Sequence, residues 1–439
     1  MSEALALVLF ALVFVLLLVG YPVAFTLGGI SVIFGLFTFG VDFFYLLPLR
    51  VFGTMGNYVL IAVPLFIFMG MMLEKSGIAE NLLETMALLF GKFKGGLAMA
   101  VVVVGAMLAA STGIVGATVI TMGLISLPTM LKRGYNVELA TGTIAASGTL
   151  GQIIPPSVVL VLLGSVLNVS VGNLFMAAVV PGLILVILYA LYIVVVSLIK
   201  PASVPSMPDE EIAQFRQKGM LTKVIKAFLL PFLLILAVLG SIFAGIDSPT
   251  EAAEVWAGGA TLLTVAQGSF NLDILRVVGK ETTHLTSMVF MILIGATAFS
   301  LVFRGLEGDT YLISLIENAQ LSPTAFLLLV MIAVFIAGFF IDFIEIIFIL
   351  VPVVAPIFSA LGIDLVWVGI LIALNLQTSF LTPPFGFSLF YLKGVAPPEV
   401  TTMHLYRGIM PFVIMQMVFL ILVVLFPEII SWFPQWISD

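Results

Sequence analysis

The chain has 439 residues, of which 62% are hydrophobic and only 9% are charged, and its formal net charge is −7. A soluble domain carries about 25% charged residues, whereas apolar runs long enough to cross about 30 Å of hydrocarbon recur along this whole chain. These values exclude a soluble globular protein. The sequence contains no cysteine, which also excludes disulfides and thiolate metal sites.

The apolar runs predict an all-α, polytopic membrane protein. Met1-Ser2-Glu3 lacks the basic start of a cleavable signal peptide, so we expect the first run to be retained as a helix. Two stretches, 96–131 and 322–360, have small or polar residues near their middles and predict re-entrant helical hairpins with protein-sheltered tips. The ten predicted crossings are 3–20, 22–40, 57–74, 136–163, 172–198, 227–246, 250–267, 283–303, 364–392 and 403–427.

Three shorter segments separate these runs. Residues 80–91 and 305–320 have apolar positions at helical spacing and predict amphipathic helices along the bilayer surface. Residues 200–226 contain prolines and charged residues of both signs, which predicts a cytoplasmic linker between two halves of the chain.

The positions of lysine and arginine predict the orientation, because cytoplasmic loops carry an excess of them. With the N-terminus outside, 14 of the 16 basic residues fall on the inner side, and only Arg50 and Arg304 fall outside. The acidic segment 427–439 with Trp432 and Trp436 suits an outer interface, so we expect both termini to be periplasmic.

The two halves share their punctuating residues at an offset of 228 positions. The matching pairs are Gly77 and Gly305, Pro128 and Pro356, Gly134 and Gly362, Asn136 and Asp364, and Pro155-Pro156 and Pro383-Pro384. Basic residues flank the first hairpin, whereas the second has none nearer than Arg304, so the hairpins enter from opposite sides. Inverted repeats with interrupted helices indicate the binding site of a secondary transporter.

Each Pro-Pro pair predicts a helix broken within the membrane. Proline lacks an N–H group and frees carbonyl oxygens upstream, and Gly148 and Gly151 let the backbone leave helical geometry before Pro155. Freed carbonyls together with hydroxyls suit Na⁺. The second half repeats this pattern from Asn375 to Gly386. The alternative is a proline kink that only shapes packing.

The middles of the hairpins are the natural partners of these breaks. Ser111, Thr112 and Gly113 are small, polar and flexible, although such residues also serve close helix packing. In the second hairpin, Gly338 is followed by Asp342, a carboxylate at hydrocarbon depth that predicts a functional role. Capping of the hairpin's second helix is the alternative for Asp342.

Several runs resemble the large membrane subunit of tripartite ATP-independent periplasmic (TRAP) transporters, the DctM-like permeases. They are Ser126 to Pro128, Lys132 to Tyr135, Ser147 to Ser157, Gly245 to Ala253 and Leu381 to Gly386. The resemblance spans essentially the whole chain and keeps the order of the motifs.

The resemblance implies Na⁺-driven uptake of small organic acids by an elevator-type transport domain that moves against a scaffold. It places two sodium sites, one at Ser111, Gly148 and Gly151 and the other at Gly338, Ser379 and Thr382. Our candidate sodium ligands also include Thr112, Gly113 and Pro155 in the first half, and Asp342 and Pro383 in the second. Candidate substrate-facing residues are Ser147, Thr149, Ser157 and Thr378.

The predicted domain organisation follows from the repeats and the resemblance. Its segments are scaffold helices at 1–54, the first repeat at 55–199 with hairpin 96–131 and broken helix 136–163, the linker at 200–226, scaffold helices at 227–282, and the second repeat at 283–439 with hairpin 322–360 and broken helix 364–392.

The predicted function is membrane translocation in a binding-protein-dependent importer of the bacterial inner membrane. The resemblance implies a small four-helix membrane subunit and a periplasmic binding protein as partners, together with a small organic anion and the bilayer, and no nucleic acid is expected. No cofactor is expected beyond Na⁺ as coupling ion. The sequence has no phosphate loop, His-Glu-x-x-His or Gly-x-Ser-x-Gly motif, so we expect no enzyme. Alternatives are a self-sufficient ion-coupled carboxylate symporter, a channel and a purely structural scaffold.

Overall fold

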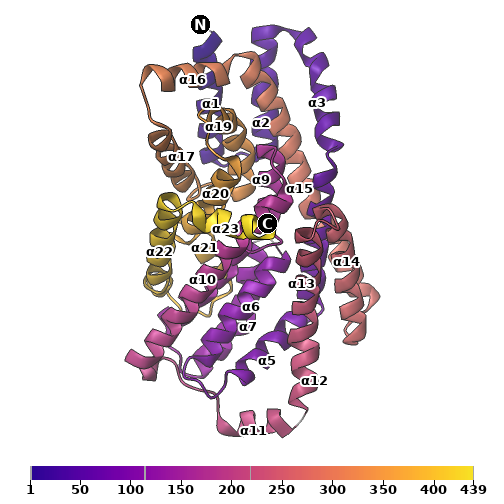
Figure 1. Ribbon diagram of the computed structural model, residues 1–439, viewed down its shortest axis with the longest axis vertical. Coiled ribbons are helices and arrows are strands. Elements are labelled where there is room, and N and C mark those ends of the chain that lie inside the picture. The colour runs from indigo at the N-terminus through magenta and orange to yellow at the C-terminus, as the bar shows by residue number, and fades with distance from the viewer. Residues whose placement is uncertain (1, 113–114, 218, 439) are drawn as a thin grey trace.

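The structure is a computed structural model that describes residues 2–112, 115–217 and 219–438. Every secondary structure element in this part of the chain is a helix, and the helices form an elongated bundle (Figure 1). The all-α polytopic fold predicted from the sequence is confirmed. The linker helices and the N-terminus lie at opposite ends of the bundle.

The helices up to the linker contain the first hairpin and the first broken helix. The N-terminal helices are α1 (Ser2–Val19), α2 (Val23–Phe39), η1 (Val41–Tyr45), α3 (Leu46–Met55), η2 (Tyr58–Ile61), α4 (Ala62–Lys75) and α5 (Ile78–Leu89). They are followed by α6 (Gly96–Thr112), α7 (Val115–Lys132), α8 (Val137–Thr149), η3 (Leu150–Gln152), α9 (Val158–Leu167) and α10 (Val171–Ile199).

The linker and the second half complete the bundle. The linker region contains η4 (Pro201–Ser203), α11 (Asp209–Gln217), α12 (Met220–Val224), the π-helical η5 (Ile225–Leu229), α13 (Leu230–Phe243) and α14 (Pro249–Ala266). The second half contains α15 (Leu272–Gly305), α16 (Gly308–Asn318), α17 (Pro323–Ala337), α18 (Phe343–Ile349), α19 (Val351–Ala360), α20 (Leu365–Leu381), α21 (Phe387–Val395), α22 (Thr402–Leu425) and α23 (Glu428–Ser438).

The helices of the two halves correspond at the offset of 228 found in the sequence. Adding 228 to the bounds of α5, α6, α8, α9 and α10 leads to α16, α17, α20, α21 and α22 in turn. The turns before the broken helices match as well. Gly134 and Gly362 both have positive φ, of 79° and 70°, where glycine is favoured. Asn136 and Asp364 then cap α8 and α20 by accepting backbone N–H groups.

The second hairpin differs from the first in its returning arm. Helix α7 continues through Pro128, whereas the second arm is divided into α18 and α19, which are bent by 51°. Pro352 lies at the start of α19, where its missing N–H group needs no partner in the preceding turn. The repeat is therefore preserved in the order of its helices, with a break in one arm.

Two helices differ from the sequence prediction. Helix α15 begins at Leu272, well before the predicted crossing 283–303, which lies inside this helix. Its first turns include charged and polar residues and are therefore not recognised by hydropathy. The Asn271 side chain caps the helix by accepting a hydrogen bond from the N–H of Ile274. Helix α3 was not predicted, because its residues 46–55 form too short a run to cross the bilayer.

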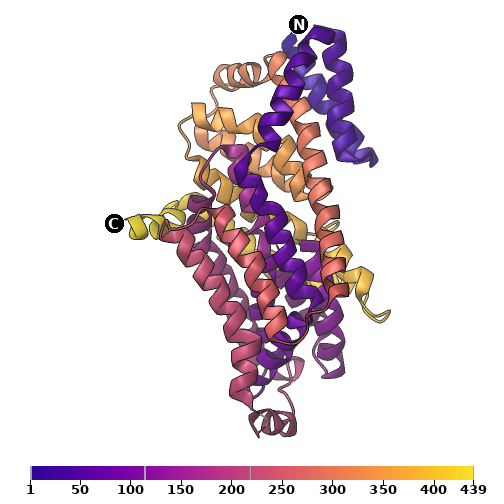
Figure 2. The same cartoon turned by 90° about the vertical axis from the view of Figure 1, so that its right-hand side faces the viewer.

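Within the described residues, six helices are long and apolar enough to cross a membrane alone, or seven if α18 and α19 count as one span. Other predicted crossings correspond to shorter apolar helices, such as α1 and α2, or to the halves of broken helices. Helix α14, which corresponds to the predicted crossing 250–267, is not among the helices that are long and apolar enough to cross alone. Figure 2 shows the C-terminal helix α23 projecting from one side of the bundle, and its exposed Trp432 and Trp436 suit an interfacial position.

Candidate functional site: two broken helices packed against hairpins

The first helix break lies between α8 and α9. Helix α8 ends at Thr149, tightens into η3, and is followed by a cis peptide bond between Pro155 and Pro156. Across the break, the Ser157 hydroxyl donates a hydrogen bond to the carbonyl oxygen of Gln152 at 3.0 Å. The prolines end the helix because they supply no N–H donor to the preceding turn. The predicted break around Pro155 is therefore present.

The second break, between α20 and α21, repeats this geometry. Thr382 has extended backbone angles, and the bond between Pro383 and Pro384 is cis. The Ser388 hydroxyl donates to the carbonyl oxygen of Phe380 at 3.0 Å. Phe380 is 228 positions after Gln152, so a serine of the following half-helix holds the equivalent carbonyl in both halves.

The first hairpin packs directly against the first break. A methyl group at Gly151 would lie closer than 3.0 Å to the carbonyl group of Ala109 on α6, and one at Gly148 would meet the Val119 side chain on α7. Gly105 of α6 approaches Ser147 equally closely. Glycine is therefore required at these positions by the close approach of the helices. Both arms of the hairpin touch the segment that the sequence singled out.

The second hairpin approaches its break in the same way. A methyl group at Gly338, at the end of α17, would lie closer than 3.0 Å to the Ser379 side chain. Asp342 follows on the same tip and caps α18, since its carboxylate accepts the Phe343 N–H at 2.8 Å. Glu345 lies one turn further on. The structure thus brings Gly338 and Ser379 together and gives Asp342 the capping contact.

The comparison with known proteins agrees with this geometry. Residues 10–429 match the family described as the tripartite ATP-independent periplasmic transporter, DctM component. The chain belongs to the DctM family. It is a multi-pass membrane permease of a TRAP transporter, as its apolar helices and the family together require.

Relatives of the DctM family match nearly the full chain. The C4-dicarboxylate TRAP transporter large permease protein DctM of Vibrio cholerae is 32% identical, over 97% of this chain and 96% of its own length. The ectoine TRAP transporter large permease protein TeaC of Halomonas elongata is 30% identical, over 94% of this chain and 95% of its own length. The motifs at the breaks therefore lie in a chain that aligns from end to end.

A solved structure supports the fold. The YdaH transporter of Alcanivorax borkumensis superimposes with a TM-score of 0.63 over 90% of each chain, at 15% sequence identity. At that identity the likeness concerns the arrangement of helices alone.

The hydroxyl groups that the sequence proposed as ligands are mostly bonded within their own helices. Four of them donate to carbonyl oxygens three or four positions earlier: Ser147 to Thr143, Thr149 to Ala146, Thr378 to Leu374 and Thr382 to Thr378. Ser379 does the same toward Leu376. Ser147, Thr149, Ser157 and Thr378 are buried. A substrate-facing role for these four stays a prediction.

Three residues of the first hairpin tip cannot be placed at the site. Gly113 lies outside the described residues. The backbone of Ser111 and Thr112 belongs to the last turn of α6, but their side chains are outside the described part. Their assignment to a sodium site stays a prediction.

Sequence reasoning missed two residues, one in the first helix break and one beside the first hairpin. The Gln152 side chain is fully buried, and within the described residues neither atom of its amide has a hydrogen-bond partner. The Tyr391 ring of α21 lies against Gly116 of the first hairpin, and its phenol is within electrostatic range of Asp342 and Glu345. Gln152 stood inside the first Pro-Pro motif, whereas nothing in the sequence pointed to Tyr391.

Proposed function

We propose that this permease imports small organic acids with a sodium gradient, using a periplasmic binding protein and a small four-helix membrane subunit in the bacterial inner membrane. The observation that carries the proposal is the pair of matching helix breaks, each packed against a hairpin tip. A helix that breaks inside the bilayer leaves backbone groups without their usual partners, and such backbone is tolerated where it lines a binding cavity.

Sodium fits the chemistry of the breaks. Hard monovalent cations take oxygen ligands, and the breaks supply carbonyls and the hydroxyls of Ser379 and Thr382. At the first break, the amide of buried Gln152, which has no partner among the described residues, offers one more oxygen. A buried amide without a partner costs free energy unless a ligand or water satisfies it. The other proposed ligands are the candidate sodium ligands that the sequence predicts in each half of the chain.

An elevator motion is the form of transport that we propose. The hairpins and the broken helices would move as one body that carries substrate and sodium. Helices α1–α3 and α13–α14 would form the scaffold, with the long α15 packed along α2, α3 and α4. The linker between α10 and α12 connects the proposed moving elements to the proposed scaffold helices at the end of the bundle away from the N-terminus (Figure 1).

The substrate class follows from chemistry that the named relatives share. C4-dicarboxylates and ectoine, which the two relatives are named for, both carry a carboxylate. We therefore propose a carboxylate-bearing solute, delivered by a periplasmic binding protein.

The decisive experiment is uptake by proteoliposomes that contain the permease and its small subunit, with purified binding protein outside. We expect accumulation of radiolabelled solute only with an inward sodium gradient. Collapsing that gradient with a sodium ionophore should return uptake to the level of empty liposomes, while a proton ionophore should not.

Three results would contradict the proposal. Uptake that ignores the sodium gradient would remove the coupling. Uptake without binding protein would favour the self-sufficient symporter. Single-channel currents would indicate a channel instead.

The Thr382→Val variant tests the second sodium site at constant side-chain volume. We expect the sodium concentration for half-maximal uptake to rise roughly tenfold, because one oxygen ligand to a charged species is lost. Thr261→Val is the matched control, since Thr261 is also half-buried and its hydroxyl also bonds the carbonyl four residues earlier. An equal change in both variants would show that Thr382 acts through helix structure alone.

A further inference from the structure

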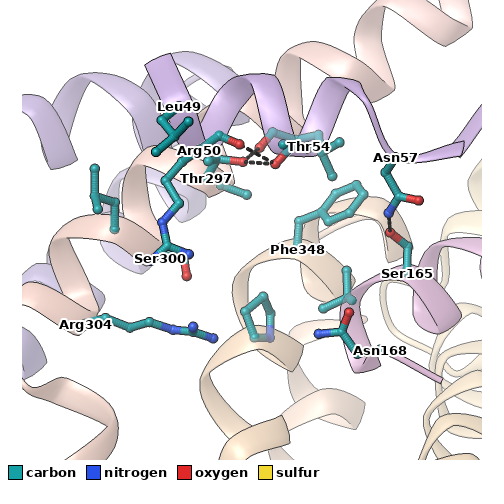
Figure 3. Close-up of a pocket in the computed structure, with 16 residues that line it drawn as sticks. Leu49, Arg50, Thr54, Asn57, Ser165, Asn168, Thr297, Ser300, Arg304 and Phe348 are labelled. Atoms are coloured by element: carbon teal, nitrogen blue, oxygen red, sulfur yellow. Dashed lines mark hydrogen bonds between the residues drawn. The ribbon is translucent and has the colours of Figure 1, made fainter. Parts of the chain in front are cut away.

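A cavity of about 400 Å³ lies between α3 and α15 on one side and α9, α18 and α19 on the other. Figure 3 shows Arg50 and Arg304 extending toward it from α3 and from the end of α15. A volume of this size accommodates a small organic molecule. The cavity is separate from the hairpin tips and the helix breaks described above.

The two guanidinium groups stand apart from acidic side chains in the part of the chain that the structure describes. No acidic residue lines the cavity, and within the described residues neither Arg50 nor Arg304 forms an ion pair. They are also the only two basic residues that the sequence analysis predicts on the outer side. Positive charge that is concentrated in a cleft and left unpaired attracts small anions.

Neutral polar groups complete the lining. The Asn57 amide donates to the Ser165 hydroxyl at 3.0 Å, and the Thr54 and Thr297 hydroxyls lie 3.2 Å apart. The cavity therefore combines two planar five-donor groups with hydroxyls that can donate or accept. Arginine binds carboxylates through paired N–H bonds. This set of groups is suited to an anion.

We propose that this cavity is an outer reception site that binds the carboxylate of the incoming solute before it reaches the helix breaks. The inference rests on the proposed function and adds a second site to it. One arginine would hold a carboxylate in bidentate fashion, and the other would hold a second carboxylate or the same group from its far side.

The cavity is lined both by α3 and α15 and by elements that belong to a broken helix and a hairpin. Arg50 and Arg304 come from α3 and α15, whereas Ser165 and Phe348 come from the first broken helix and the second hairpin. If those elements move relative to each other during transport, the site opens and closes with them. Binding there would therefore report which conformation the permease adopts.

The test is equilibrium binding of radiolabelled succinate and of ectoine to the purified permease in phosphatidylcholine nanodiscs. We expect the Kd of the bound probe to rise at least about tenfold in Arg50→Ala and in Arg304→Ala, and binding to vanish in the double variant. Arg276→Ala is the matched control, because Arg276 is an exposed arginine near the other end of α15. It should bind like the unchanged protein.

Several outcomes would overturn the inference. They are binding of neither probe by the unchanged protein, a Kd in both single arginine variants equal to that of the unchanged protein, and intact sodium-driven uptake by the double variant. Loss of succinate binding when phosphatidylglycerol is added to the nanodiscs would assign the cavity to a lipid headgroup. Normal probe binding with weakened binding-protein association would assign the arginines to protein docking.

Failure of the reception site and failure of the proposed function give different results. Uptake that needs no sodium, with arginine-dependent succinate binding, would overturn the sodium coupling and leave the reception site. Sodium-driven uptake that is insensitive to both arginines would do the reverse.

Discussion

Replacement of Gly408 by alanine should destabilise the permease more than a methyl group added to a glycine on an open helix surface. Gly408 on α22 faces the backbone of α8, and an added methyl group would lie closer than 3.0 Å to the carbonyl oxygen of Glu138. The opposing Gly142 meets the backbone of Gly408 equally closely. Because backbone atoms cannot rotate away, the two helices must separate. Such overpacking typically costs about 1–3 kcal/mol.

The measurement is the thermal unfolding midpoint of the purified protein in one detergent. Gly240→Ala is the control, since a methyl group on Gly240 of α13 would meet nothing within 4 Å. It should leave the midpoint unchanged or raise it, because alanine is the better helix former. The double variant with Gly142→Ala should lose less than the sum of the two single losses, because both act at one crossing. Equal midpoints for Gly408→Ala and Gly240→Ala would contradict the prediction.

The Gly151→Ala variant should strongly reduce sodium-driven uptake while the protein still inserts into the membrane. The added methyl group would lie closer than 3.0 Å to the Ala109 carbonyl, so η3 and α6 must move apart at the proposed first sodium site. Displacement of coordinating oxygens by even a fraction of an ångström weakens an ion site strongly, because ligand distances are short and fixed. We expect uptake at least about tenfold lower, which corresponds to about 1.4 kcal/mol.

Two comparisons separate loss of the site from general unfolding. Gly258→Ala on α14 is the matched control, since a methyl group there would contact nothing. At the second site, Gly338→Ala meets a side chain instead of backbone, so Ser379→Gly in the same chain should restore its thermal stability. If the Ser379 hydroxyl binds sodium, the double variant should still require a higher sodium concentration for half-maximal uptake than the unchanged protein. Full uptake by Gly151→Ala would contradict the proposed position of the first site.

The inverted-repeat architecture could be predicted because proline and glycine act locally. A proline removes an N–H donor in any context, and the paired prolines at 155–156 and 383–384 mark the two breaks, whereas α7 continues through the single Pro128. Gly134 and Gly362 reach positive φ for the same local reason. The hydropathy of the runs similarly needs no tertiary information, since the bilayer imposes the length of a crossing.

The sequence could not predict which residues meet at the sites, because these depend on contacts between segments that are far apart in the chain. Tyr391 reaches the first hairpin only because α21 packs beside α7, which no local pattern encodes. The cavity with Arg50 and Arg304 joins residues that are 254 positions apart, and the sequence showed them only as two exceptions to the charge count. The polar start of α15 was missed because hydropathy reports on the lipid-facing part of a helix.

By itself, the sequence determined that this chain crosses the membrane many times, that its halves repeat, and that each half contains a helix broken at a Pro-Pro pair. These properties follow from backbone chemistry and from hydropathy, which act over a few residues to one helix length. Only the tertiary structure decided which glycines touch which carbonyls, that the buried Gln152 amide is left without a partner among the described residues, and that two arginines share one cavity. Those facts depend on how helices pack, and packing is fixed by the shapes of all the surfaces together.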